Sequence, residues 1–288
     1  MELCRPHPAD LAQEPAAARH QRVDGAARIA FAAPGRLADL YQRAPCRILF
    51  PDVEPSEPVE AVSVTTSGGL TGGDRIRVEV AIAAGAAATV TTQAAEKLYR
   101  VLPGDPDIRI ETRVSVGAGG WGEWLGQEAI LFEGTRVARA FEADVAVTGR
   151  LLAVESLVFG RSAMGEAMRT GRVHDSWRIR RDGRLLWVDA LRLEGDVAAA
   201  MAAPFAFGDA TSSATIVYVA DDAARHLDAA RALIAGDRGG ATSFDGMLIV
   251  RLLAADAAAL RRAVVRIAAG LRAAAGGFAG RMPAIWRC

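Results

Sequence analysis

Residues 65–100 read TTSGGLTGGDRIRVEVAIAAGAAATVTTQAAEKLYR, and this stretch decides the fold class. In its segment 75–82 every second side chain is apolar and the side chains between them are mostly charged, which is the two-residue period of a half-buried β-strand. Four glycines at positions 68, 69, 72 and 73 predict turns with positive φ or close backbone contact. A phosphate-binding loop is excluded, because Asp74 stands where a Walker loop needs lysine and GGLTGG lacks the GxGxxG spacing.

The same alternation recurs along most of the chain. Prolines 51, 55 and 58 mark an extended connection before the predicted strand at residues 62–64, since proline lacks the amide that a central strand requires. An Asp182-Gly183 turn predicts a two-strand hairpin. Ordered structure is expected to begin with residues 22–31. The predicted strands cover residues 62–64, 75–82, 108–116, 121–134, 136–147, 151–160, 172–179, 184–193, 213–220 and 247–254.

Helical spacing begins only late in the sequence. Apolar residues recur every three or four positions in 227–234, after Asp221 and Asp222, and again from Asp256 to residue 271. A small α+β appendage is one interpretation of this region. We predict a mainly β fold, a sandwich-like architecture of antiparallel or mixed sheets with two α-helices near the C-terminus. Residues 1–22 are expected to form a mobile tail, and residues 23–288 a single β-rich domain.

Charge and composition exclude several classes of partner. The chain has 34 basic and 34 acidic residues, so no net charge attracts nucleic acid or an anionic membrane. No uncharged stretch reaches the length of a spanning helix, and the first 22 residues lack the apolar core of a signal peptide. Three cysteines, far apart in sequence, argue against a disulfide framework. We therefore expect a cytoplasmic protein.

Four segments in a fixed order resemble the urease accessory protein family called UreD or UreH. They are SGGLTGGD (67–74), TTQAAEKLYR (91–100), GEWLGQEAILFEG (122–134) and MPAIWR (282–287). The resemblance extends from about Arg22 to Arg287. It implies a chaperone or scaffold, not an enzyme, that is required to insert nickel into urease. It also implies three partners: urease apoprotein, UreF and, through UreF, the GTPase UreG.

The carboxylates suggest two alternatives. Six of them, the five named below and Glu155, lie in apolar or glycine-rich surroundings, where a buried charge is costly unless it is paired or meets a cation. One interpretation is that they are exposed or pair with Arg161, Arg169 and Arg178. The other is a polar passage in which oxygen ligands hold Ni²⁺ transiently, because a closed nitrogen and sulfur site would release it slowly. This second set comprises Asp74, Glu123, Glu128, Glu166 and Asp175.

The four histidines do not stand at ligand spacing from a cysteine or carboxylate, so we predict no stable metal site and no tightly bound cofactor. The polar segment after residue 90 is either an amphipathic rim or a partner surface, since Tyr and Arg are favoured interface anchors. Its candidate partner-binding residues are Thr91, Gln93, Lys97, Tyr99 and Arg100. A carboxylate-dependent hydrolase of unknown substrate is the alternative function, with an acid and base pair drawn from the carboxylates.

Overall fold

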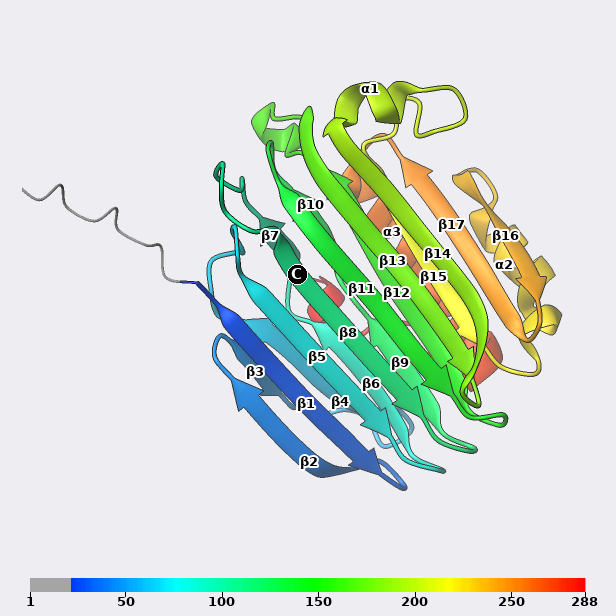
Figure 1. Cartoon of the computed structure of the whole chain (residues 1–288). Coiled ribbons are helices and arrows are strands. Elements are labelled where there is room, and N and C mark those ends of the chain that lie inside the picture. The colour runs from blue at the N-terminus through cyan, green and yellow to red at the C-terminus, as the bar shows by residue number, and fades with distance from the viewer. Residues whose placement is uncertain (1–21, 288) are drawn as a thin grey trace, which may run out of the picture.

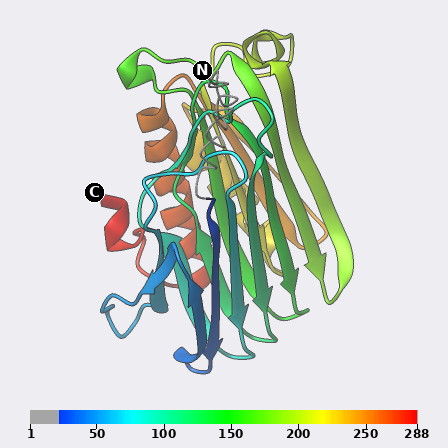
Figure 2. The same cartoon turned by 60° about the vertical axis from the view of Figure 1, so that its left-hand side comes forward.

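The computed structural model describes residues 22–287, so the predicted N-terminal tail lies almost wholly outside the described residues. Two β-sheets face each other, and helices cover the outer side of one of them (Figure 1). Figure 2 shows the resulting three layers from another direction. One apolar core fills the space between the sheets, and a second lies between the helices and the larger sheet. The mainly β, sandwich-like fold with helices near the C-terminus is therefore confirmed.

The first sheet has seven strands in the order β14-β13-β11-β8-β5-β1-β2. Its inner strands, from β1 to β13, all pair in parallel, whereas β2 and β14 at the two edges pair antiparallel. The strands are β1 (Asp24–Ala32), β2 (Arg36–Arg43), β5 (Arg75–Ile82), β8 (Ile108–Val116), β11 (Arg136–Val145), β13 (Thr170–Arg181) and β14 (Arg184–Asp196).

The second sheet has ten strands, with the main order β16-β17-β15-β12-β9-β6-β4-β3, and β10 joins β12 to β7 beside it. Parallel pairs again occupy its centre. The strands are β3 (Cys46–Leu49), β4 (Val59–Thr65), β6 (Ala87–Thr92), β7 (Glu96–Leu98), β9 (Trp121–Leu125), β10 (Ala129–Leu131), β12 (Arg150–Phe159), β15 (Ser212–Val219), β16 (Arg238–Phe244) and β17 (Met247–Ala254).

Parallel pairing follows from the path of the chain between the sheets. From β5 to β13 the chain returns to the first sheet only after visiting the second, as in the order β5, β6, β7, β8. Two strands that are neighbours in one sheet are therefore separated by an excursion through the other sheet and run in the same direction. Hydrophobic alternation is identical for parallel and antiparallel strands with one buried face, so it predicted the strands but not this pairing.

The alternation in 75–82 has the predicted consequence. Ile76, Val78 and Val80 of β5 are buried in the core between the sheets, while Arg75 is exposed on the opposite side. The outer face of the first sheet carries cross-strand ion pairs, such as Arg178 Nη1 to Glu142 at 2.8 Å. This solvent-facing side needs no covering layer.

Three α-helices lie in the described residues: α1 (Val197–Ala202), α2 (Leu227–Ile234) and α3 (Ala257–Leu271). The long α3 packs against the second sheet through residues such as Leu260, Val264 and Ile267. The suggested α+β appendage is wrong, since β15 and β17 are internal strands of the second sheet. None of the helices in residues 22–287 is long and apolar enough to cross a membrane.

The predicted helix start at Asp256 is confirmed, but the one at Asp222 differs. Asp256 caps α3, because its Oδ1 accepts a hydrogen bond from the Ala259 amide at 2.7 Å. The Asp222 side chain makes no capping bond and instead accepts from the Tyr218 hydroxyl at 2.8 Å. Asp222 therefore anchors the loop to the sheet rather than beginning the helix.

We predict that Asp256→Ala lowers the free energy of unfolding by about 1 kcal/mol, the usual contribution of an N-cap side chain. Chemical denaturation followed by circular dichroism measures it. Asp228→Ala is the control, because this side chain lies at the exposed start of α2 and makes no capping bond. Equal denaturation midpoints for the two variants would contradict the capping role.

Candidate functional site

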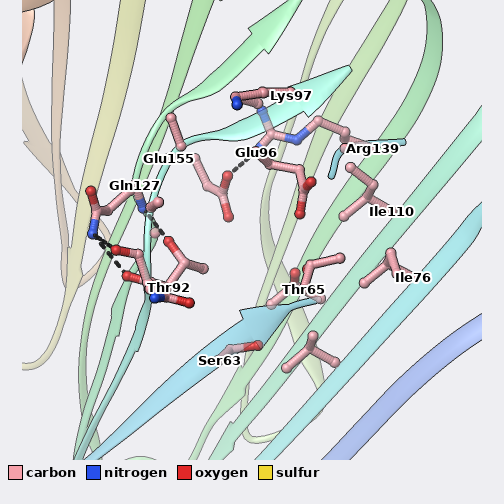
Figure 3. A pocket seen from close by; sticks show the side chains of 18 of the residues that line it. Ser63, Thr65, Ile76, Thr92, Glu96, Lys97, Ile110, Gln127, Arg139 and Glu155 are labelled. Atoms are coloured by element: carbon pink, nitrogen blue, oxygen red, sulfur yellow. Dashed lines mark hydrogen bonds and ion pairs between the residues drawn. The ribbon is translucent and has the colours of Figure 1, made fainter. Parts of the chain in front are cut away.

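A cavity of about 270 Å³ lies between the two sheets, beside the glycine-rich segment that follows β4 (Figure 3). Strands of both sheets contribute its walls. Its polar lining includes Ser63, Thr65, Thr92, Glu96, Gln127, Arg139 and Glu155. Apolar residues Ile76 and Ile110 close the side formed by the first sheet. The cavity thus brings charged and polar side chains from both sheets into the interior of the sandwich.

Arg139 is a buried charged residue in the lining of this cavity. Buried and half-buried residues alternate along β11, and Arg139 occupies an inward position, with only 8% of its side chain exposed. Its guanidinium pairs with Glu155 of β12, and Nε lies 3.6 Å from Asp175 of β13. The indole of Trp124 donates a second bond to Glu155 at 2.7 Å. The arginine thus joins the two sheets through charges that are compensated inside the core.

A second cavity, of about 500 Å³, lies on the other side of this charge cluster. Glu155 lines both cavities, and Asp175, Trp177, Asp189 and Arg251 line the second. Burial raises the pKa of Asp175, and the positive charge of Arg139 opposes this shift only in part. Members of the Arg139, Glu155 and Asp175 cluster therefore line both cavities of the sandwich.

Two of the five carboxylates of the predicted passage have other surroundings. Asp74 accepts hydrogen bonds from the amides of Val23 at 2.7 Å and Thr71 at 2.8 Å, so it fixes the glycine-rich turn. Glu123 lies on the helix-covered face of the second sheet. It pairs there with Arg272, which follows α3, at 2.8 Å.

The other three also have partners. Glu128 pairs with Arg261 of α3 at 2.9 Å, and Glu166 pairs with Arg161, as the alternative interpretation anticipated. Asp175 is the member of the set that lines one of the two cavities. The structure therefore does not bring the five together in one passage. Among residues 22–287 there is no cluster of three or more His, Cys, Asp or Glu side chains able to hold a metal ion.

The candidate partner-binding residues divide into one buried residue and four exposed ones. Thr91 is buried; its hydroxyl donates to the Leu125 carbonyl at 2.6 Å and accepts from Trp286 Nε1 at 2.9 Å. Gln93, Lys97, Tyr99 and Arg100 are exposed at the edge of the first cavity or beside it. These four form an accessible surface, which we call the mouth surface.

Two buried arginines were missed in the sequence. Arg139 and Arg272 are 8% and 3% exposed and organise the two ion-pair clusters. Arg139 was detectable, because an arginine at an apolar position of an alternating strand must point inward. Arg272 had no comparable signal, since it lies in a short π-helical turn beyond α3 (Arg272–Gly276).

Comparison with known proteins identifies the family. The profile described as UreD urease accessory protein matches residues 23–287, nearly the whole chain. The chain belongs to the UreD urease accessory protein family. It is 39% identical to the urease accessory protein UreD of Rhizobium leguminosarum bv. trifolii over 274 residues, 94% of this chain and 97% of that protein. The corresponding protein of Methylobacterium sp. strain 4-46 is 42% identical over 267 residues, 88% and 93% of the two chains.

The four segments that resemble UreD proteins are connected in space by side-chain hydrogen bonds, and the first three contribute residues to the first cavity. The Tyr99 hydroxyl donates to the Gly68 carbonyl at 2.8 Å, which joins the first two segments. Gln127 Nε2 donates to the carbonyls of Thr92 and Gln93, each at 2.9 Å, and joins the third. The Trp286 bond to Thr91 adds the fourth. Segments that are far apart in sequence are therefore joined at the first cavity, and the fourth is held on the helix-facing side of the second sheet.

We predict that Glu123→Gln lowers the free energy of unfolding by about 3 kcal/mol, because it leaves the buried charge of Arg272 with only Glu57 as its carboxylate partner. Urea denaturation measures the loss. Glu79→Gln serves as the control, since Glu79 is 46% exposed and lies 3.6 Å from Arg113 on the solvent side. If Glu123→Gln and the control unfold at the same urea concentration, the Arg272 pair does not anchor the C-terminal segment.

Proposed function

We propose that this chain is a scaffold for urease maturation that is required for nickel insertion into apo-urease in the cytoplasm. In this role it binds the apoprotein and UreF, and through UreF it recruits the GTPase UreG. Family membership over residues 23–287 is the observation that carries the proposal. The relatives' names support urease maturation, and the partners and the nickel step are our inference.

A scaffold explains the cavity carboxylates better than a hydrolase does. General acid–base catalysis needs a carboxyl group that can exchange a proton with substrate. Glu155 accepts from both Trp124 and Arg139, and Asp175 faces the same arginine. These contacts hold the carboxylates in place within the core. We therefore propose that the protein is not an enzyme.

We propose that Ni²⁺ is held only transiently if it passes through this protein, with no tightly bound cofactor. Asp175 is the predicted ligand to test first, because it lines a cavity and its ion pair with Arg139 is long, at 3.6 Å. Scattered oxygen ligands bind a divalent cation weakly enough to release it.

The mouth surface gives a direct test of partner binding. We expect Tyr99→Ala with Arg100→Ala to weaken the complex with UreF at least tenfold in a pull-down titration, while the circular dichroism spectrum stays unchanged. Tyr and Arg anchors often dominate interface energy. Arg28→Ala with Tyr41→Ala is a matched control, because it removes the same residue types from strands β1 and β2, away from the mouth surface. Equal affinity for UreF in the two double variants would place the partner surface elsewhere.

Asp175→Asn tests the passage. Burial already favours the neutral form of Asp175 by raising its pKa, so the isosteric amide should change the thermal midpoint little. If Asp175 carries the cation, assembly with the accessory proteins survives and the nickel content of activated urease falls.

Asp189→Asn provides the control, since Asp189 lines the same cavity but pairs with the exposed Arg251. Early melting of Asp175→Asn would assign the residue a structural role. Nickel loading equal to that of wild type would remove Asp175 from any passage.

A further inference from the structure

Two buried polar atoms at the first cavity have no hydrogen-bond partner within residues 22–287. They are Arg139 Nη1 and Ser67 Oγ, and both residues line this cavity. Arg139 comes from β11 in the first sheet, whereas Ser67 comes from the glycine-rich loop that follows β4. Two independent parts of the chain therefore present unused hydrogen-bonding groups to one space.

Leaving such groups without a partner is costly. A buried donor without an acceptor costs about 1–3 kcal/mol, and a charged donor costs more. Arginine cannot lose its proton to reduce this cost. Buried polar groups in native proteins are accordingly paired with protein, ordered water or ligand. The arginine in this cavity calls for an acceptor oxygen.

The charges around the cavity favour an anionic acceptor. Both oxygens of Glu155 already accept hydrogen bonds, one from Trp124 and one from Arg139, so this carboxylate does not compete for Nη1. Glu96 also lies on the cavity wall, and burial raises the pKa of its carboxyl group. Lys97 adds a second cation at the rim. Two cations, Arg139 and Lys97, therefore line the space that an anion would enter.

The size of the space limits the ligand. Pockets for drug-sized molecules measure about 300–1,000 Å³, so a cavity of about 270 Å³ suits a small group. A carboxylate has two oxygens in one plane, and charge-assisted bonds from arginine to carboxylate are among the stronger ones in proteins. A carboxylate therefore offers as many acceptor oxygens as this cavity has groups without a partner in the described residues, Arg139 Nη1 and Ser67 Oγ.

We propose that the first cavity is a binding site for a carboxylate-type oxyanion, held by Arg139 and Ser67. This goes beyond the proposed function, which names only proteins and Ni²⁺. The carboxylate has two sources with the same chemistry: a free small ion, or an Asp or Glu side chain of a partner that enters at the mouth surface.

Ligand-observed NMR with the full chain tests the site, using ¹³C-labelled formate and acetate at constant ionic strength maintained with chloride. We expect saturable binding of both ions to the wild-type protein. Ser67→Ala removes one donor and should weaken affinity about tenfold. Arg139→Lys keeps the positive charge that faces Glu155 but removes the planar guanidinium with its several N–H donors. It should weaken affinity by at least as much as Ser67→Ala does. Ser115→Ala, on the outer face of the first sheet, should bind as wild type.

Absence of saturable binding, or equal affinity for wild type and Ser67→Ala, would overturn the proposal and leave water as the occupant of the cavity. Either result leaves the urease-maturation role intact, because the measurement involves no accessory protein.

A competition experiment then separates the two sources. If a partner supplies the carboxylate, acetate should weaken the complex with UreF or apo-urease relative to chloride, and Ser67→Ala should weaken it as well. If the source is a free ion, acetate binds the isolated chain and complex formation is the same in both salts.

Discussion

A buried arginine that pairs with a carboxylate of the neighbouring layer attaches each layer of this protein to the next. Arg139 of the first sheet meets Glu155 of the second, and Arg272 beyond α3 meets Glu123 on the other face of that sheet. Such pairs add little net stability, because desolvation offsets most of the attraction between the charges. Breaking one partner is nevertheless expensive, so the pairs restrict how the layers can slide past one another. Apolar packing alone would leave that alignment less well defined.

Much of the fold could be predicted from side-chain patterns. The alternation in 75–82 and the Asp256 cap each report a local preference that the tertiary structure preserves. Strand pairing could not be predicted, because the direction of a neighbouring strand depends on the route of the chain between the sheets. The assignment of β15 and β17 to an appendage failed for the same reason: their sequences describe buried strands but do not say which sheet contains them.

The site was less predictable than the fold. We selected carboxylates by their apolar neighbours in the sequence, and some of them, such as Asp74 and Glu123, are indeed buried. However, backbone amides donate hydrogen bonds to Asp74, and Glu123 pairs with Arg272, which is distant in sequence. Thr91 illustrates the converse error. It stands in a polar segment that suggested a surface, yet its position in β6 directs it under Trp286. Resemblance to a family supplied the biological role, and only coordinates could show which polar residues share a cavity.

The path of the chain between the two sheets also sets the order in which the molecule can assemble in time. Strand β1 completes its pairing only when β5 has formed, and β4 only when β6 has formed. Neither sheet can therefore be completed before most of the other sheet has formed. Contacts between distant parts of a chain form slowly, because loop closure precedes the gain from packing. Arg272 and Trp286, the partners of Glu123 and Thr91, follow every strand of the two sheets along the chain. On the ribosome, the second sheet therefore keeps its helix-facing side uncovered until α3 and the segment after it have emerged.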